Sequence, residues 1–208
     1  YLKNDLEFWN KHGEFITNHK KGYGYWIWKS YIIKKTMESM NDGDILLYLD
    51  AGCEIDKSKP DHMENLFNQV IQHKILYTGS GFPELTYTKK DLFIELGLYT
   101  EEIGQTQQCA AGVIMFLVNN EMRKLVNDWY RLSSCYHFID ESPSKSSCQD
   151  IVIYNIRNNT TTKFSDHRHD QSILSLLIKK YGYKYYNIVH GNKAIIYNRN
   201  RTGISKLK

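Results

Sequence analysis

The chain has 208 residues, with 41% hydrophobic and 24% charged residues and a net charge of +4. This composition is ordinary for a soluble globular protein, and the length fits one domain with a sizeable core. No stretch approaches the roughly 20 apolar residues of a membrane span. Lys and Arg are spread along the chain and form no long run, so a nucleic-acid-binding tail is not indicated either.

The cysteines and the aromatic residues indicate which metal-binding, redox and ligand-binding sites the sequence could form. No pair of the four cysteines has Cys-x-x-Cys spacing, which argues against a zinc ribbon or a thioredoxin-like motif, and we expect the cysteines to be reduced. Aromatic residues make up 13% of the chain, including 16 Tyr and 4 Trp. Tyr and Trp suit walls that hold sugars and bases by stacking, although a Tyr-rich core would give the same composition.

The first residue of the chain indicates whether the sequence starts at a natural initiator Met. The first residue is Tyr rather than Met, so we expect a fragment or a processed product whose N-terminal anchor would lie outside this sequence. No signal peptide is visible. With neither a signal nor a transmembrane segment in this chain, a cytoplasmic protein is favoured.

Apolar residues and turn residues together predict alternating helices and strands. Apolar residues at helical spacing and turn residues that mark helix ends predict helices at 2–19, 27–40, 60–72, 89–96, 119–132 and 169–181. Short apolar runs predict strands at 44–50, 75–78, 112–118, 185–189 and 194–197. We expect a turn at 20–25 and a Ser- and Cys-rich loop at 133–148. The alternation predicts one α/β domain.

The run at 44–50 is the most informative strand, because it is continuously apolar and ends in Asp50. Continuous apolarity predicts a strand buried on both faces, as in the centre of an α/β sheet. A carboxylate at the end of such a strand lies where open α/β sheets bind ligands, and the small residues Ala51 and Gly52 allow close approach. Asp50 could hold Mg²⁺ or Mn²⁺ that bridges phosphates, or could simply be a turn residue.

A second candidate segment runs from Gly22 to Lys29 and reads GYGYWIWK. A glycine turn followed by aromatic residues and a lysine could cradle a diphosphate or stack a base, with Tyr25 and Lys29 as contacts. For Trp26 and Trp28, a role as core anchors that pin the following helix is the favoured interpretation.

A third candidate segment, HRHDQS, opens the helix predicted at 169–181. His169, Asp170 and Gln171 lie at its N-terminus, where backbone N–H groups are free and the helix dipole is positive. Asp170 could bind a ligand or could merely cap its own helix. One such cluster supplies too few ligands to indicate zinc.

Two weaker signals lie elsewhere in the chain. Small residues precede the strand at 112–118, so a ligand can approach Gly112 closely and Gln108 could reach it. Near the C-terminus, Arg199 and Arg201 could hold phosphate or could be solvated tail charges.

The segments GYGYWIWK, YLDAGC and HRHDQS, in this order, resemble a group of viral and bacterial polysaccharide glycosyltransferases of the GT-A fold. The resemblance covers about residues 2–200. It implies an α/β, Rossmann-like fold with a central mixed sheet flanked by helices, in a single domain over 1–208. The first βαβ unit of that fold would be missing or much reduced, which also suggests a fragment.

The resemblance also implies roles for individual residues. Asp50 matches the first acid of the metal-binding DxD motif, whereas Gly52 stands where the second acid is expected. Asp170 and Gln171 match the catalytic element that contacts the donor sugar. Mn²⁺ or Mg²⁺ would be held by Asp50 and by His190, which belongs to a shortened C-terminal metal and phosphate motif. The nucleotide-sugar would be bound by Tyr25, Lys29, Asp50, Ala51, Gly52, Gln108, Gly112 and His169.

The expected function is therefore transfer of a sugar from a nucleotide-diphosphate sugar to a glycan or another hydroxyl acceptor. One alternative is an inactive sugar-binding or scaffold domain derived from such an enzyme, which the glycine at position 52 favours. A second alternative is a metal-dependent phosphoryl-transfer enzyme that uses Asp50, Asp170 and the nearby histidines.

Overall fold

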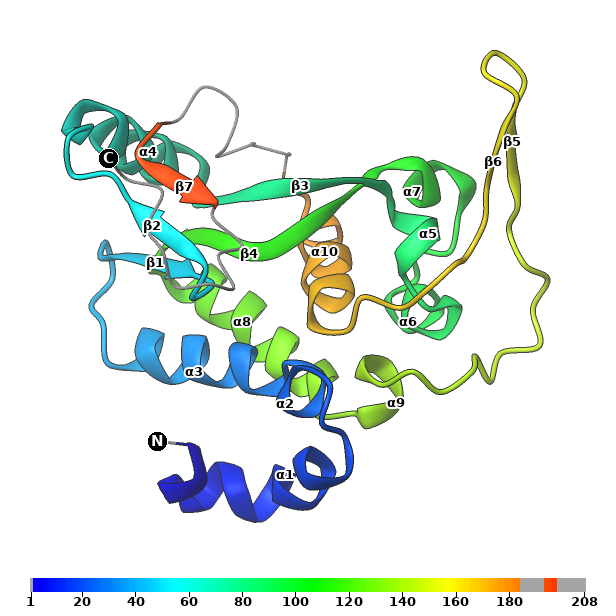
Figure 1. Ribbon diagram of the computed structural model, residues 1–208, viewed down its shortest axis with the longest axis horizontal. Helices are drawn as coiled ribbons and strands as arrows, with labels where there is room; N and C mark the ends of the chain where they lie inside the picture. Colours follow the sequence, from blue (N-terminus) through cyan, green and yellow to red (C-terminus); the bar gives the residue numbers. More distant parts are fainter. Residues whose placement is uncertain (1, 184–192, 198–208) are drawn as a thin grey trace.

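The computed structural model describes residues 2–183 and 193–197, which form a mixed α/β structure (Figure 1). The main sheet is antiparallel and has the order β1-β4-β3. Two antiparallel pairs, β2 with β7 and β5 with β6, complete the described strands. The strands are β1 (Ile45–Leu49), β2 (Cys53–Ile55), β3 (Ile75–Pro83), β4 (Gln107–Leu117), β5 (Ile153–Asn155), β6 (Thr160–Thr162) and β7 (Ile195–Tyr197).

The predicted helices are present. A short 3₁₀ turn, η1 (Leu2–Asn4), precedes α1, because the Asp5 side chain accepts a hydrogen bond from Phe8 N and starts the helix there. The helices are α1 (Leu6–Asn18), α2 (Gly22–Tyr25), α3 (Ile27–Glu38), α4 (Pro60–His73), α5 (Glu84–Tyr87), α6 (Lys90–Leu96), α7 (Glu101–Gln105), α8 (Asn120–Ser133), α9 (Tyr136–Ile139) and α10 (Asp170–Lys180). The segment 133–148, expected to be a loop, contains the short α9, and the strand expected at 185–189 lies outside the described residues.

The central strand is β4, and both of its faces are buried. Ile114 and Phe116 belong to the larger core, which also contains residues of α1, α3, α8 and α10, whereas Val113 and Met115 pack with α4 residues. Helices therefore cover one face of the sheet and α4 covers the other, as Figure 1 shows. Within the described part of the chain, no helix is both long and apolar enough to cross a bilayer.

The central position expected for the run at 44–50 is wrong. Among the described residues β1 lies at the edge of the sheet, and only Leu46 of β1 is buried. Its side chains do contact both cores, with Leu46 and Tyr48 on one face and Ile45 and Leu47 on the other. The continuous apolar run therefore indicated correctly that both faces of β1 contact apolar side chains. It did not indicate the position of β1 in the sheet. The described sheet is also antiparallel rather than mixed.

The turn expected at 20–25 is present and has an unusual backbone. Five consecutive residues, 22–26, have positive φ, and Tyr25 N and Trp26 N donate to Lys21 O and Gly22 O across a left-handed turn. Each non-glycine residue in this conformation costs about 1–2 kcal/mol. The turn reverses the chain between α1 and α3, and Trp28 Nε1 anchors it by donating to Gly22 O.

Gly24 should be much less tolerant of a side chain than a glycine with similar backbone geometry in open space. A Cβ at Gly24 would lie 2.6 Å from Ile16 Cγ1, whereas a Cβ at Gly97 would meet nothing within 4 Å, and φ is positive at both. We predict that Gly97→Ala loses about 1 kcal/mol of unfolding free energy and that Gly24→Ala loses a further 1–3 kcal/mol or so through overpacking. Urea unfolding measures both values, and equal losses would show that the turn is not packed as described.

Candidate functional site

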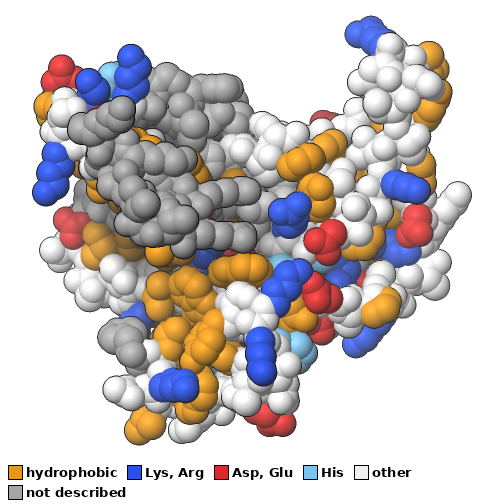
Figure 2. All heavy atoms as spheres, in the orientation of Figure 1, with side chains coloured by type: hydrophobic (Ala, Val, Ile, Leu, Met, Phe, Trp, Pro, Cys, Tyr) orange, Lys and Arg blue, Asp and Glu red, His pale blue; other side chains and the backbone are white. Residues whose placement is uncertain are grey.

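The three segments singled out in the sequence meet around one cavity of about 250 Å³. The start of α3, the residue after β1, the middle of β4 and the start of α10 all contribute to it. On the face drawn in Figure 2, basic, acidic and His side chains gather between the grey atoms and the projecting arm of β5 and β6. The cavity is lined by Lys21, Trp26, Lys29, Asp50, Ala111, Gly112, Asp166, Arg168, His169, Asp170 and Gln171.

The Lys29 ammonium is the centre of this arrangement. Lys29 is only 4% exposed, and its Nζ lies 3.2 Å from Asp170 Oδ2 and 3.4 Å from Asp50 Oδ1. Nζ also donates to Ala111 O at 3.1 Å and lies 5.2 Å from the centre of the Tyr48 ring. A buried ammonium is costly unless it is paired, so these contacts fix the Lys29 side chain between the two carboxylates.

The first carboxylate, Asp50, is held at the open side of the cavity. Its side chain is about half exposed, and Asp50 N donates to Gly112 O, which continues the pairing of β1 with β4. The Tyr48 hydroxyl donates to Asp50 Oδ1 at 2.8 Å. Burial and the neighbouring carboxylates raise the pKa of Tyr48, so the phenol stays protonated and keeps this bond. A Cβ at Gly112 would lie 3.0 Å from Asp50 Oδ2, so a side chain at position 112 would crowd the carboxylate.

The second carboxylate, Asp170, lies in a different environment. It is buried, and burial raises its pKa to about 6, although Lys29 acts in the opposite direction. Asp170 does not cap its own helix, because His169 is the N-cap residue of α10 and makes no side-chain capping bond. Trp129 Nε1 donates to Asp170 O at 3.0 Å and helps fix the start of α10. Asp170 therefore faces Lys29 as a carboxyl group whose pKa is raised to about 6.

His169 presents an unsatisfied acceptor beside the cavity. Its φ of 56° is in the left-handed region, and its ring stacks on Tyr25 with centroids 4.6 Å apart. Nδ1 bonds to Ile139 O at 2.8 Å, and burial lowers the pKa, so the neutral ring carries its proton on Nδ1. Nε2 is then an acceptor, and it is buried without a hydrogen-bond partner among the described residues; the nearest carboxylate oxygen, on Glu141, is 3.9 Å away.

Gln171 lines the cavity as predicted, whereas Gln108 supports it from behind. Gln171 Nε2 donates to Gln108 Oε1 at 2.7 Å, and Gln171 Oε1 accepts from Ala111 N at 3.4 Å. Gln108 is fully buried, and its amide donates to Thr88 and Ser172 in an internal network. Gln108 is therefore outside the lining and positions Gln171.

Three other predicted contacts also lie outside the lining. Tyr25 is buried behind His169, and its hydroxyl donates to Glu141 Oε2 at 3.3 Å. Ala51 and Gly52 form the turn after β1 and contribute no lining surface. Trp26, by contrast, was expected to be a core anchor, but it is only half-buried and lines the cavity.

The described residues do not complete a metal site. No group of three His, Cys, Asp or Glu side chains among them is arranged to hold a metal ion. Asp50 is the one proposed ligand that the structure describes, since His190 lies outside the described residues, as do Arg199 and Arg201. Between Asp50 and Asp170, the place that a bridging cation would take is filled by the Lys29 ammonium. We therefore propose no reaction step that involves Mn²⁺ or Mg²⁺.

Sequence reasoning missed three charged lining residues, Lys21, Asp166 and Arg168. Lys21 directly precedes the glycine turn and Arg168 lies inside HRHDQS. Their closeness to two candidate motifs could have indicated that they line the cavity. Asp166 carried no such signal. Comparison of the chain with models of protein families, with curated proteins and with solved structures found no match.

The raised pKa of Asp170 predicts a specific pH dependence of stability. Between about pH 4 and pH 6 the folded protein holds a proton that the unfolded chain has released, so this group makes stability fall as pH rises. Asp170→Asn removes the titration. From pH 3.5 to pH 7, the unfolding free energy of the variant should therefore gain about 2–3 kcal/mol relative to the native protein. Urea unfolding across this range measures the difference, and parallel stability curves would contradict the burial of an ionisable Asp170.

Proposed function

We propose that this chain transfers a sugar from a nucleotide-diphosphate sugar to a hydroxyl of a glycan, on a scaffold of the GT-A type. The observation that supports the proposal most is the cavity in which the buried Lys29 joins Asp50 and Asp170, with Gln171 and His169 beside them. These groups come from three segments far apart in the sequence, and each segment carries a motif that resembles part of a donor site.

The polar groups of the cavity suit a sugar. A sugar presents several hydroxyls, each both donor and acceptor, and the carboxylates and the Gln171 amide can accept from them. The volume of about 250 Å³ is smaller than the 300–1,000 Å³ or so of typical sites for drug-sized ligands. The cavity therefore suits the sugar part of the donor, with the diphosphate at its rim, where Lys21 and Arg168 contribute positive charge.

The charges also suit the chemistry of glycosyl transfer. The bond between the anomeric carbon and the diphosphate breaks, and its electron pair leaves with the nucleoside diphosphate. The acceptor oxygen bonds to the anomeric carbon, and its proton passes to a carboxylate of the cavity. Negative charge on the leaving group would be stabilised by Lys29 and the two rim cations. Positive charge at the anomeric carbon would be stabilised by the carboxylates of Asp50 and Asp170.

An inactive sugar-binding domain is the second candidate. Gly52 replaces the second acid of the metal motif, and the described residues complete no metal site. Such a domain would bind nucleotide-sugar or sugar in the same cavity without turnover. The two candidates therefore differ in release of nucleoside diphosphate, which a turnover assay measures.

Turnover should depend strongly on both carboxylates, and in different ways. With a panel of UDP- and GDP-sugars, Asp50→Ala should abolish release of nucleoside diphosphate while the fold is kept, because Asp50 is half exposed.

Asp170→Ala should lower kcat about 100-fold or more but change nucleotide affinity little, because its contact is with the reacting sugar.

A matched control is Asp61→Ala, which removes an exposed carboxylate on α4. Its kcat and its nucleotide affinity should equal those of the native protein. Near-native turnover of Asp50→Ala would refute the assignment of the donor site. An equal loss of kcat and nucleotide affinity in Asp170→Ala would refute its contact with the sugar.

A further inference from the structure

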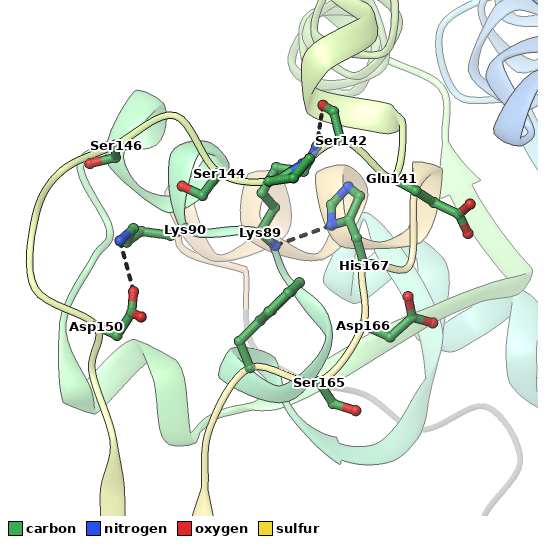
Figure 3. A pocket seen from close by; sticks show the side chains of 12 residues that line it. Lys89, Lys90, Glu141, Ser142, Ser144, Ser146, Asp150, Ser165, Asp166 and His167 are labelled. Carbon is green, nitrogen blue, oxygen red and sulfur yellow. Dashed lines mark hydrogen bonds and ion pairs between the residues drawn. The ribbon is translucent and has the colours of Figure 1, made fainter.

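A second cavity, of about 470 Å³, adjoins the first and shares Asp166 with it. Its walls are the start of α6, the segment after α9 and the segment that leads into α10 (Figure 3). In that view the Lys90–Asp150 ion pair lies at one end, and Glu141 and Asp166 lie at the other. The lining residues are Lys89, Lys90, Glu141, Ser142, Pro143, Ser144, Ser146, Asp150, Phe164, Ser165, Asp166 and His167.

One wall of this cavity is held in place by a carboxylate outside it. Asp91 Oδ1 accepts hydrogen bonds from Ser144 Oγ and from Ser146 N at 2.9 Å, and Oδ2 accepts from Lys145 N at 2.7 Å and lies 2.5 Å from His137 Nε2. Burial alone would raise the pKa of Asp91, but these bonds together lower it, so the carboxylate stays ionised and keeps them. The bonds to Asp91 therefore hold the Ser-rich segment in one conformation as a wall of the cavity.

The cations of this cavity are already paired within the protein. Lys89 is buried, and its Nζ bonds to Asp140 Oδ1 at 2.9 Å and to His137 O at 2.6 Å. Lys90 Nζ bonds to Asp150 Oδ1 at 2.7 Å and to Cys148 O at 2.7 Å. Neither ammonium therefore offers an unpaired charge to an anion.

The remaining groups favour a neutral, hydroxyl-rich ligand. Asp166 forms no ion pair with any of the described residues, and Glu141 is paired with Lys21 at the edge of the first cavity. The surplus charge is therefore negative, which disfavours phosphates and uronates. Four serine hydroxyls line the walls, and Phe164, which is 49% exposed, offers an apolar face. Polar groups around one apolar ring match the alternating polar edges and apolar faces of a pyranose.

We propose that this second cavity is the acceptor site and that it binds a neutral saccharide, with Phe164 against a sugar face and Asp166 beside the attacking hydroxyl. The proposal rests on the proposed function, because it takes the first cavity as the donor site. Asp166 lines both cavities, so a hydroxyl bound next to it lies at the junction through which the donor sugar would pass to the acceptor.

The test uses saccharide binding and nucleotide binding as separate measurements on the same chain. The probes are neutral trisaccharides of glucose, galactose, mannose and N-acetylglucosamine, with a trisaccharide of galacturonic acid as the anionic comparison. Ligand-observed NMR gives their affinities, and thermal shift with UDP- and GDP-sugars reports the donor site. Phe164→Ala removes the exposed ring, and Phe67→Ala removes a similarly exposed ring on α4 as a matched control.

We expect at least one neutral trisaccharide to bind, and Phe164→Ala to weaken it by about fivefold or more, in line with 1 kcal/mol or so for an aromatic contact. Phe67→Ala should not weaken it, and both variants should keep the shift caused by the nucleotide-sugar. Asp166→Lys should raise the affinity for the galacturonate probe, because it reverses the surplus charge.

Two results would overturn the acceptor site while leaving the donor site intact. One is a normal nucleotide-sugar shift with no binding of any neutral trisaccharide, or with binding that Phe164→Ala leaves unchanged. The other is tighter binding of the galacturonate probe than of the neutral ones by the native protein. Absence of any nucleotide-sugar shift in the native protein would instead refute the proposed function on which the inference rests.

Discussion

The ammonium of Lys29, buried between two carboxylates and a carbonyl, is the interaction on which the site depends. A buried charge without partners would cost several kcal/mol, so Lys29 has to meet Asp50, Asp170 and Ala111 O together. That requirement brings the starts of α3 and α10 to the edge strand β1 and the central strand β4. The left-handed turn at 22–26 serves the same end, because it lets α3 start at the cavity directly after α1.

The two carboxylates that contact Lys29 have different properties because they differ in burial. Asp50 is about half exposed and accepts from the Tyr48 hydroxyl, whereas Asp170 is buried and titrates near pH 6. They therefore provide acceptors of different strength within one small cavity. Such a set suits a ligand with many hydroxyls better than a single anion, and the second cavity, with its internally paired lysines, continues this preference.

The sequence predicted most helices and four residues that line the first cavity. Asp50 follows an apolar strand, Lys29 follows a glycine turn, and Asp170 and Gln171 open a helix, so each lies at an element end that local patterns mark. Strand order could not be predicted, because β1 is apolar on both faces although it lies at the edge of the sheet that the described residues form. The buried bonds of Gln108 and the ordering of the Ser-rich segment depend on partners distant in sequence, which no local pattern reports.

The most direct measurement is a thermal-shift titration of the chain with UDP, GDP and their sugars, each with and without Mn²⁺. A ligand that binds only the folded state raises the melting temperature. We predict that a nucleotide-sugar raises it more than the matching nucleoside diphosphate does, because the sugar would contact Asp50, Asp170, Gln171 and His169 in the cavity. If no nucleotide-sugar shifts the melting temperature under either condition, the assignment of this cavity as a donor site is wrong.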